Sequence, residues 1–431
     1  MRVIADLHIH SRFSRATSQN MTIDEITHYS KIKGLTLVGT GDFTHPTWFN
    51  ELSEELSEVS GTNLYCSATK PESPVRYMLT AEVCTTYYVN EKNKRIHHVI
   101  FTPNLETASQ INDRLKQYGD LTVDGRPFLE MTSAQLVEEI MQVSNQNEVI
   151  PAHVWTPWFS LFGAFSGFDT VEDCYEDMTK HIHALETGLS SDPPMNWRLS
   201  TLDRFTLISN SDCHSHWPWR IGREANVFEL PKLTYMEIVE TLRKKDNKRF
   251  KFTIETDPAY GKYHWSGHRK CKVSFSPAEA IKYGNICPEC GRKLTRGVDQ
   301  RIEELADRPA DYVPENPIGY KRLLPLHEII KAVLGVSSPA TKKVWAIYDS
   351  LIEKFGDEYS VLIDAPQEEM NAVVEPRIAD AIVRVREEKA HVTPGYDGVY
   401  GELVLFDEKQ TENTAVVPPE QPKQKSMFDF M

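Results

Sequence analysis

The sequence ADLHIHSRFS, residues 5–14, places two histidines, His8 and His10, directly after a short apolar run near the start of the chain. Alternate residues of a β-strand share one face, so the two imidazoles are expected to point the same way. Taken alone, the pair fits two metal ligands and two half-exposed polar side chains equally well. The segments that follow decide between these interpretations.

Short β-like segments alternate with helix-like segments through residues 1–230, which is the pattern of an α/β fold with a parallel sheet. Helices are expected, for example, at residues 23–33 and 132–144. Seven such units favour a barrel over an open sheet. The expected strands are residues 2–7, 35–40, 77–82, 97–101, 148–152, 182–187 and 205–210.

Nearly every expected strand carries or ends in a side chain that can bind a metal ion. In a β/α barrel the carboxyl ends of the strands meet on one face, where active sites are built. Imidazoles and carboxylates without thiolates suit Zn²⁺, Mn²⁺ or iron, and so many ligands suggest two or three ions. The side chains are His8, His10, Asp42, Glu82, His97, His98, His153, Glu186, Asp212 and His214.

Clustered divalent ions activate water and bind both oxygens of a phosphoryl displacement, so phosphoester hydrolysis is the predicted chemistry. Amide or ester hydrolysis in an amidohydrolase-like barrel fits less well. Such barrels typically use a bridging lysine, and no lysine stands at the end of an expected strand.

The motifs DLHIHS, GTGDF, AEV, HHVIF, PAHVW, LETGLSSD and SNSDCHSH resemble those of the PHP (polymerase and histidinol phosphatase) domain over about residues 1–230. The resemblance implies a distorted seven-stranded β/α barrel that holds up to three metal ions. It also implies a set of metal ligands: His8, His10, Glu82, His98, His153, Asp212 and His214.

Two positions depart from the usual PHP pattern. Asp42 is followed by Phe43 instead of histidine, so the ligand at this corner is either Asp42 or His45. Arg15 stands where the family often has an acidic residue or a histidine. We therefore expect Glu186 and Asp192 to complete the ligation or to carry proton transfer, with catalytic roles alongside His8 and His10.

A Cys-x-x-Cys knuckle, Cys287 and Cys290, predicts a structural zinc site in a small module spanning residues 236–300. Cys271 supplies a third thiolate. The fourth ligand is taken as His268, with His264 as the alternative.

The zinc module is basic although the chain as a whole is acidic. Residues 231–300 hold 15 Lys and Arg against 8 Asp and Glu, whereas the whole chain has a formal net charge of −14. The segment, including Arg269 and Lys270, is interpreted as a surface that contacts the phosphate backbone of a nucleic acid, or else as a solvated face.

The last part of the chain is predicted to be a helical domain, residues 301–400, and a flexible tail, residues 401–431. The tail ends in QKSMFDFM, which fits the spacing of the peptide that binds sliding clamps. The anchor positions would be Gln424, Met427, Phe430 and Met431, with Met431 in place of the usual aromatic residue.

A PHP barrel followed by a zinc module, a helical region and such a tail is similar to the layout of endonuclease Q, a family of archaeal DNA repair enzymes with some bacterial relatives. The segments LSSDPPMNWRLS, YHWSGHRKC, CPECGRKL and EELADRP extend the resemblance along essentially the full chain. It implies nicking on the 5′ side of deoxyuridine, hypoxanthine, xanthine or an abasic site, leaving a 3′-hydroxyl and a 5′-phosphate. It also implies partnership with the archaeal sliding clamp, PCNA.

Within this interpretation the expected metals are Zn²⁺, two or three in the catalytic site and one structural, with Mg²⁺ or Mn²⁺ as alternatives at the catalytic site. Residues 153–169 are unusually aromatic and are expected to form the wall of a pocket for an extruded base, or else a packed lid. The expected substrate-binding residues are Trp155, Trp158, Phe159, Ser166, Gly167, Arg269 and Lys270.

Two other functions stay open at this point. A small-molecule phosphoesterase of the histidinol-phosphatase kind explains the barrel but gives no role to the zinc module or the tail. A clamp-associated scaffold without activity conflicts with the near-complete ligand set. The chain starts in a strand-like segment and has no apolar run of about 18 residues, so a cytoplasmic, nucleoid-associated protein is expected.

Overall fold

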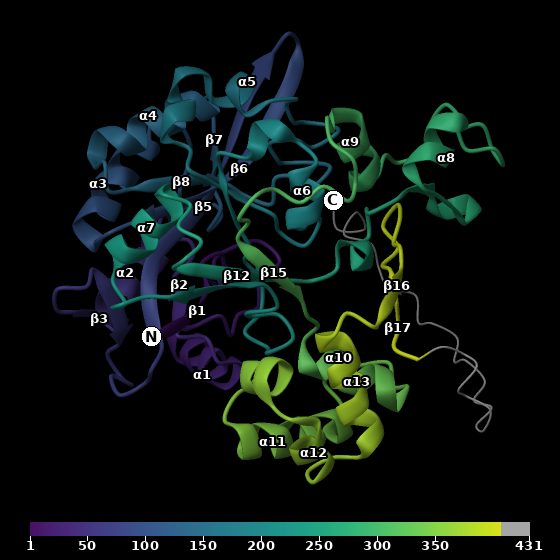
Figure 1. The fold of residues 1–431 in the computed structure, drawn as a ribbon. Coiled ribbons are helices and arrows are strands. Elements are labelled where there is room, and N and C mark those ends of the chain that lie inside the picture. Colours follow the sequence, from purple (N-terminus) through teal and green to yellow (C-terminus); the bar gives the residue numbers. More distant parts are fainter. Residues whose placement is uncertain (407–431) are drawn as a thin grey trace.

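The computed structural model describes residues 1–406 (Figure 1). Seven strands form the ring of a distorted barrel. These strands are β1 (Arg2–Asp6), β2 (Leu37–Gly39), β5 (Arg76–Val89), β6 (Lys92–Thr102), β8 (Glu148–Pro151), β9 (Ala184–Glu186) and β10 (Thr206–Ile208). Parallel pairing joins β1 to β2, β2 to β5 and β9 to β10. The predicted distorted seven-stranded barrel is confirmed.

Side-chain and backbone hydrogen bonds close the ring where regular pairing stops. Val154 N donates to Glu186 O at 2.9 Å and so joins the ends of β8 and β9. An isolated parallel bridge between Ile9 and Cys213 joins the segments that follow β1 and β10. These links place the segments that follow β1, β8, β9 and β10 at one end of the ring.

The strand β6 runs antiparallel to both of its neighbours, β5 and β8, whereas the sequence pattern predicts a parallel sheet. The reason is the turn between β5 and β6. Asn90 and Glu91 both have positive φ, 48° and 64°, as in the two-residue turns that connect antiparallel strands directly. The chain therefore reverses at this point without a crossover helix.

An apolar cluster with members on all seven strands fills the ring, including Ala5, Leu37, Met78 and Ile208. The helix α7 (Tyr235–Arg243) closes the end of the ring where β1 begins, because its buried residues join the same cluster. The opposite end, where β1 ends, is left free for polar side chains.

Further helices and strands surround the ring. The helices are α1 (Ile23–Lys33), α2 (Pro46–Glu55), α3 (Leu105–Leu115), α4 (Ser133–Val143), α5 (Val171–Tyr175) and α6 (Pro193–Trp197). The additional strands are β3 (Leu56–Val59), β4 (Leu64–Ser67), β7 (Phe128–Leu129), β11 (Ala225–Glu229), β12 (Phe250–Glu255) and β15 (Gly319–Arg322).

The main sheet reaches beyond residue 236, where the zinc module was expected to begin. The main sheet continues from β1 through β11 and β12 to β15, so residues up to 255 and again 319–322 belong to it. The sequence pattern did not show this because β12 lies within the basic segment 231–300, and the edge strand β15 has only four residues, GYKR, without an apolar period.

The zinc module branches from the barrel between β12 and α9 (Val298–Leu305), and it appears with α8 at the side of the molecule in Figure 1. It contains β13 (Ser266–His268), β14 (Val273–Phe275) and α8 (Pro277–Lys282). Its own buried apolar cluster consists of Ala280, Cys287 and Leu294 with a few half-buried neighbours. So small a core needs a metal ion or a support to hold its fold.

Four helices form a separate group beneath the barrel in the view of Figure 1. These are α10 (Leu326–Leu334), α11 (Lys342–Phe355), α12 (Gln367–Asn371) and α13 (Pro376–Arg386). The hairpin of β16 (His391–Thr393) and β17 (Glu402–Val404) runs from this group to the zinc module, where Asp397 accepts hydrogen bonds from Arg269 N and Thr295 Oγ1, both at 2.6 Å. No helix among residues 1–406 is both long and apolar enough to span a bilayer.

Candidate active site

Six predicted or neighbouring ligands converge at the free end of the ring. His8, His10, Glu82 and Asp212 offer ligand atoms that all lie within 4.8 Å of one another, and Glu82, His97 and His153 form a second group by the same measure. We call these six residues the metal-binding cluster. Glu82 belongs to both groups, so the geometry suits two ions that share one carboxylate.

The pairing of β5 with β6 places Glu82 and His97 on the same face. Glu82 stands opposite Val99, and His97 lies two residues before Val99 on the same strand. His97 Nδ1 is 2.9 Å from Glu82 Oε1, and His153 Nε2 is 3.1 Å from the same oxygen. The two imidazole nitrogens also face each other at 3.2 Å, as two ligands of one ion would.

The prediction that His98 binds a metal is wrong, and its neighbour His97 takes that place. His98 stands opposite Val83, so it points to the other face of the sheet, where its ring meets the Tyr175 ring edge-on. Neither of its ring nitrogens has a hydrogen-bond partner, and burial lowers the pKa of His98 to about 3. It is a neutral core residue.

Glu186 lies behind His8. The His8 Nδ1 donates to the carboxylate, 3.0 and 3.1 Å from its two oxygens, and the carboxylate also accepts from Asn210 Nδ2 and from His153 N, both at 2.8 Å. This leaves His8 Nε2 buried without a hydrogen-bond partner and facing Glu82 and Asp212. Glu186 is therefore a positioning residue that fixes the tautomer of His8, not a member of either ligand group.

Asp42 has the same relation to His10. The His10 Nδ1 donates to Asp42 Oδ1 at 3.0 Å, while Asp42 Oδ2 accepts from Ser11 N, Ser11 Oγ and Ser14 Oγ. The alternative ligand His45 caps the start of α2 and contacts Thr122 O. The corner that the sequence left open thus holds a carboxylate that orients a ligand instead of binding the ion itself.

Asp212 and His214 follow β10 at the margin of the cluster. Asp212 Oδ1 lies 3.0 Å from His10 Nε2, as a shared ion would require. The His214 ring packs on the His10 ring with centroids 4.5 Å apart, and its Nδ1 donates to Asp212 O. His214 lies outside both ligand groups, so its role as a ligand stays a prediction.

The structure places Asp192 away from the histidines. It caps the start of α6 through Met195 N and forms an ion pair with Arg322. None of its contacts within residues 1–406 reaches the metal-binding cluster. Its role as a ligand or a proton shuttle therefore rests on the sequence resemblance alone.

The cluster is arranged for cations. Burial would raise the pKa of Glu82, but His97, Arg126 and His8 outweigh it and hold that pKa well below its ordinary value. Burial would lower the pKa of His8, but Glu186 and Glu82 raise it instead. Together with the unpartnered His8 Nε2, these buried carboxylates fit divalent ions.

Sequence reasoning missed Arg126, which lies in the loop before β7. Its Nη1 is 3.2 Å from Glu82 Oε2. No motif marks this arginine, because the loop that carries it follows α3 and returns to the site only through the fold.

A further group of candidate metal ligands lies in the predicted zinc module. His268, Cys271, Cys287 and Cys290 offer ligand atoms within 4.8 Å of one another, with Cys290 Sγ 3.4 Å from His268 Nδ1. The alternative ligand, His264, is not in this group. Three thiolates and one imidazole form a closed ligand set typical of structural zinc.

The aromatic loop 153–169 has an inner and an outer part. Trp155 is buried, stacks on Phe162 and donates to Asn196 Oδ1 at 2.8 Å, so its predicted contact with substrate is wrong. Ser166 Oγ accepts from Phe159 N, and Gly167 O accepts from Lys94 Nζ. Ser166 and Gly167 therefore brace the loop instead of facing a substrate.

The outer part of the loop is exposed beside the metal-binding cluster. Trp158 and Phe165 are 41% and 51% exposed and stack with centroids 4.8 Å apart, and Phe128 from β7 is 47% exposed. Phe159 packs on the His97 ring at 5.1 Å and contacts Phe128 edge-on. We call Phe128, Trp158, Phe159 and Phe165 the aromatic ridge.

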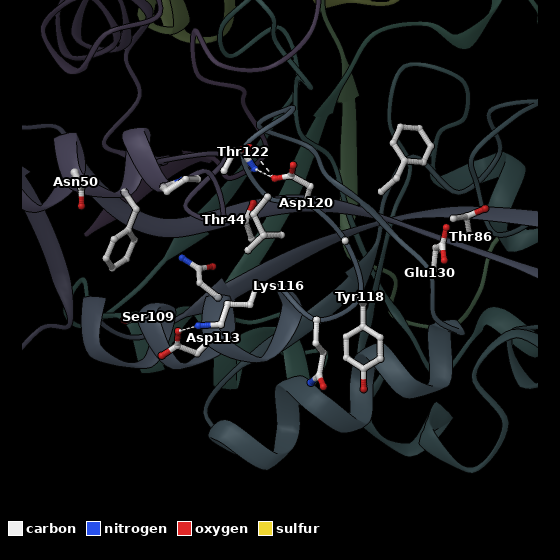
Figure 2. Close-up of a pocket in the computed structure, with 17 residues that line it drawn as sticks. Thr44, Asn50, Thr86, Ser109, Asp113, Lys116, Tyr118, Asp120, Thr122 and Glu130 are labelled. Carbon is white, nitrogen blue, oxygen red and sulfur yellow. Dashed lines mark hydrogen bonds and ion pairs between the residues drawn. The ribbon is translucent and has the colours of Figure 1, made fainter.

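Figure 2 shows a pocket of about 900 Å³ next to this region, lined by α2, α3 and the segment that leads to β7. Its polar lining is largely self-paired, as in Lys116 with Asp113 and Thr122 with Asp120. None of the metal-binding cluster lines this pocket, so it is not the catalytic centre.

One known domain family matches the helical group. A family described as the MJ0043 C-terminal domain matches residues 325–389, which include α10 to α13. The uncharacterized protein MJ0043 of Methanocaldococcus jannaschii is 35% identical over 257 residues, 59% of this chain but 32% of MJ0043, so the match spans about a third of that protein. The uncharacterized protein YqxK of Bacillus subtilis is 29% identical over 93% of this chain and 99% of its own length.

A solved structure decides the family. The lesion-specific endonuclease PfuEndoQ from Pyrococcus furiosus is 33% identical to this chain, with a TM-score of 0.84, over 96% of this chain and 98% of that one. The chain belongs to the endonuclease Q family. A structure of endonuclease Q with a 27-mer duplex that has an abasic lesion at its active site matches with a TM-score of 0.83 over the same shares. The resemblance read from the sequence is confirmed, and the metal-binding cluster is the candidate catalytic centre of this endonuclease Q fold.

Proposed function

We propose that this chain is a DNA repair endonuclease that hydrolyses the phosphodiester on the 5′ side of a deaminated base or an abasic site. The observation that carries the proposal is the metal-binding cluster with its shared carboxylate, Glu82, in a chain of the endonuclease Q family. The solved complex of endonuclease Q with abasic DNA supports the choice of substrate.

Two divalent ions bound by the cluster would lower the pKa of a water molecule and offset the charge of the phosphate. Within the chain, Glu186 and Asp42 orient His8 and His10 so that their Nε2 atoms face Glu82 and Asp212. Water attacks phosphorus, the bond to the 3′ oxygen breaks, and the products are a 3′-hydroxyl and a 5′-phosphate. We propose Zn²⁺ for these positions, with Mg²⁺ or Mn²⁺ as alternatives, and Zn²⁺ for the module.

Recognition of the lesion requires the nucleotide to leave the base stack. The aromatic ridge supports this step, since Trp158 and Phe165 form an exposed stacked pair beside His97 and Phe159. Such a pair can fill the space that an extruded nucleotide vacates or stack on the base itself. Trp158 and Phe159 thus keep the substrate-binding role expected from the sequence.

The zinc module is proposed to contact the DNA backbone. Arg269 and Lys270 are exposed on it, and the β16–β17 hairpin anchors it through Asp397. Basic side chains on a fixed module give affinity that does not depend on base sequence.

The proposed partner of the tail is the sliding clamp. Gln424, Met427, Phe430 and Met431 lie outside the described residues, so the sequence spacing alone supports this part. Deletion of residues 424–431 should abolish binding to the clamp and leave nicking of short duplexes intact. Retained clamp binding would contradict the assignment.

Nicking of defined duplexes tests the main proposal. The chain is loaded with Zn²⁺, Mn²⁺ or Mg²⁺ and incubated with labelled duplexes that hold one deoxyuridine, one deoxyinosine, one abasic site or no lesion. We expect a single nick 5′ to the lesion, with a 3′-hydroxyl and a 5′-phosphate, and no nick in the undamaged duplex. Turnover of phosphomonoesters without nicking would favour the small-molecule phosphoesterase instead.

A further inference from the structure

Arg126 is a cation held at the catalytic centre without a use in the reaction described so far. Among residues 1–406 it is the only lysine or arginine that forms an ion pair with a carboxylate of the metal-binding cluster. Its side chain is 23% exposed, while Glu82, its partner, is fully buried. The guanidinium therefore lies between the buried ligands and the solvent.

The backbone on both sides of Arg126 is fixed. Arg126 N donates to Asp124 Oδ1 at 3.1 Å, and the same oxygen accepts from Arg15 N at 3.1 Å. On the other side, Pro127 O accepts from Cys84 N at 2.9 Å, next to β7. The backbone that carries Arg126 is thus held in place independently of the ion pair with Glu82.

The ion pair with Glu82 satisfies the guanidinium only in part. Among residues 1–406 the buried Arg126 Nε finds no hydrogen-bond partner, and Glu82 is the carboxylate that both ligand groups share. A carboxylate that binds two cations has little capacity left for a third. A part-buried guanidinium without its acceptor strongly favours another anion, and its fork of donors matches a phosphate.

We propose that Arg126 binds a nonbridging oxygen of the scissile phosphate, an inference that rests on the proposed function. In this role it is a catalytic residue that touches the substrate. It offsets the charge that builds on the phosphate during attack, and it holds the 5′-phosphate of the nicked product.

Binding of an unreactive product duplex tests the contact directly. Two nicked duplexes are prepared, one with a 5′-phosphate and one with a 5′-hydroxyl on the lesion nucleotide, and their Kd is measured by fluorescence anisotropy with the metal-loaded protein. The wild type should prefer the 5′-phosphate. Arg126→Ala should lose about 10- to 100-fold of affinity for the phosphate form and little for the hydroxyl form, which corresponds to one charge-assisted contact. Arg126→Lys should recover part of the preference.

A matched control is Arg114→Ala on α3, which removes an arginine that pairs with Glu139 of α4 and not with a carboxylate of the metal-binding cluster. This variant should bind and nick as the wild type does. Metal content by mass spectrometry and the thermal midpoint are measured for all variants, and Arg126→Ala should keep the full number of ions.

Each outcome bears on the inference. If Arg126→Ala keeps the wild-type preference for the 5′-phosphate, or weakens both duplexes equally, or loses metal ions, Arg126 has a structural role and the inference is wrong. A wild type that fails to nick any lesion duplex contradicts the proposed function itself. A wild type that nicks, with an unaffected Arg126→Ala, contradicts only the role of Arg126.

Discussion

Two adjacent histidines show how narrowly the site is defined at the scale of a single residue. His97 contacts Glu82, while His98 points to the other face of the sheet and meets Tyr175. The motif HHVIF places a ligand on this strand but does not say which histidine it is. That choice depends on the register between β5 and β6, which no local pattern records.

The same substitution at the two positions should therefore give opposite results. His97→Leu removes a ligand of the second group and should reduce nicking by at least about 100-fold, with loss of bound metal. His98→Leu replaces a neutral core residue without a hydrogen-bond partner among residues 1–406, and it should leave the nicking rate and the metal content nearly unchanged. The measurements are nicking rate and metal content, and a larger loss in the His98 variant would reverse the assignment.

Changing a carboxylate that lies behind a ligand should reduce metal affinity less than removing the ligand itself, but more than changing a surface residue. Glu186→Gln and Asp42→Asn keep the shape of each side chain while weakening its hold on His8 or His10. We expect each to reduce metal affinity by about 10- to 100-fold. Titration of the metal-free protein with Zn²⁺ measures this, with Glu229→Gln as an exposed control. Complete loss of binding would instead identify these carboxylates as ligands.

At the scale of elements, the sequence predicted the strands of the ring and most of the residues that the fold gathers in the metal-binding cluster, because potential ligands recur along the chain in step with these strands. It did not predict the antiparallel direction of β6 or the short strands that extend the sheet. The direction depends on the two-residue turn at Asn90 and Glu91, and residue types alone do not reveal its positive φ angles. Arg126 was missed for a related reason, since its loop reaches the site through long-range contacts.

Two buried glutamates, Glu224 and Glu255, lie next to the paired strands β11 and β12. Glu224 precedes β11 and Glu255 ends β12, where the adjacent register pairs Ala225 with Ile254. Burial raises the pKa of Glu255 to about 8, well above its ordinary value of 4.5. Because the folded pKa is the higher one, the stability that protonated Glu255 contributes is complete below about pH 4.5 and is lost as the pH rises toward 8.

Glu255→Gln should therefore raise the free energy of unfolding relative to the wild type, and this gain should grow as the pH rises. Near pH 5 the free energies of unfolding of the variant and the wild type should change with pH in nearly the same way. Between pH 5 and pH 8 the variant should gain up to about 1.4 kcal/mol per pH unit relative to the wild type. Thermal unfolding at several pH values measures this. Glu229→Gln, which changes an exposed residue of β11, should show no such trend.

The zinc module should need its metal ion to stay folded. Its apolar core is small, so Cys290→Ser should release one ion per chain and unfold the module. Hydrogen exchange should rise within residues 262–297, and DNA affinity should fall, while the ions of the metal-binding cluster remain. Cys66→Ser, which changes a cysteine outside the module, is the control. An unchanged exchange pattern in Cys290→Ser would contradict the need for the ion.

At the scale of the whole molecule, a buried ion pair connects the barrel to the helical group. Lys33 of α1 and Glu358 lie 2.6 Å apart, almost fully buried, and Glu358 also accepts from Leu326 N and Tyr348 OH. Because 325 positions separate the two partners, no local sequence pattern indicates the contact or this domain interface. The predicted domain limits were read from composition and so missed it.

Breaking this pair should destabilise the assembly. Lys33→Met leaves Glu358 buried without its cation and should cost about 3–5 kcal/mol of stability. The double variant Lys33→Met with Glu358→Gln should recover much of this, because no buried charge remains. Thermal unfolding compares the two, with Lys31→Met as the exposed control on the same helix. Equal losses in the single and double variants would contradict the electrostatic origin.

The shared carboxylate Glu82 has a consequence for the way the enzyme responds to its surroundings. If one side chain serves two ions, as the two ligand groups that share Glu82 suggest, the occupancy of one position changes the affinity of the other, and a chain with a single ion would lack part of its proposed catalytic centre. Activity then rises with more than the first power of the free metal concentration. When metal is scarce, such an enzyme would lose its activity over a narrow range of free metal concentration. DNA cutting would then be coupled to the metal supply of the cell.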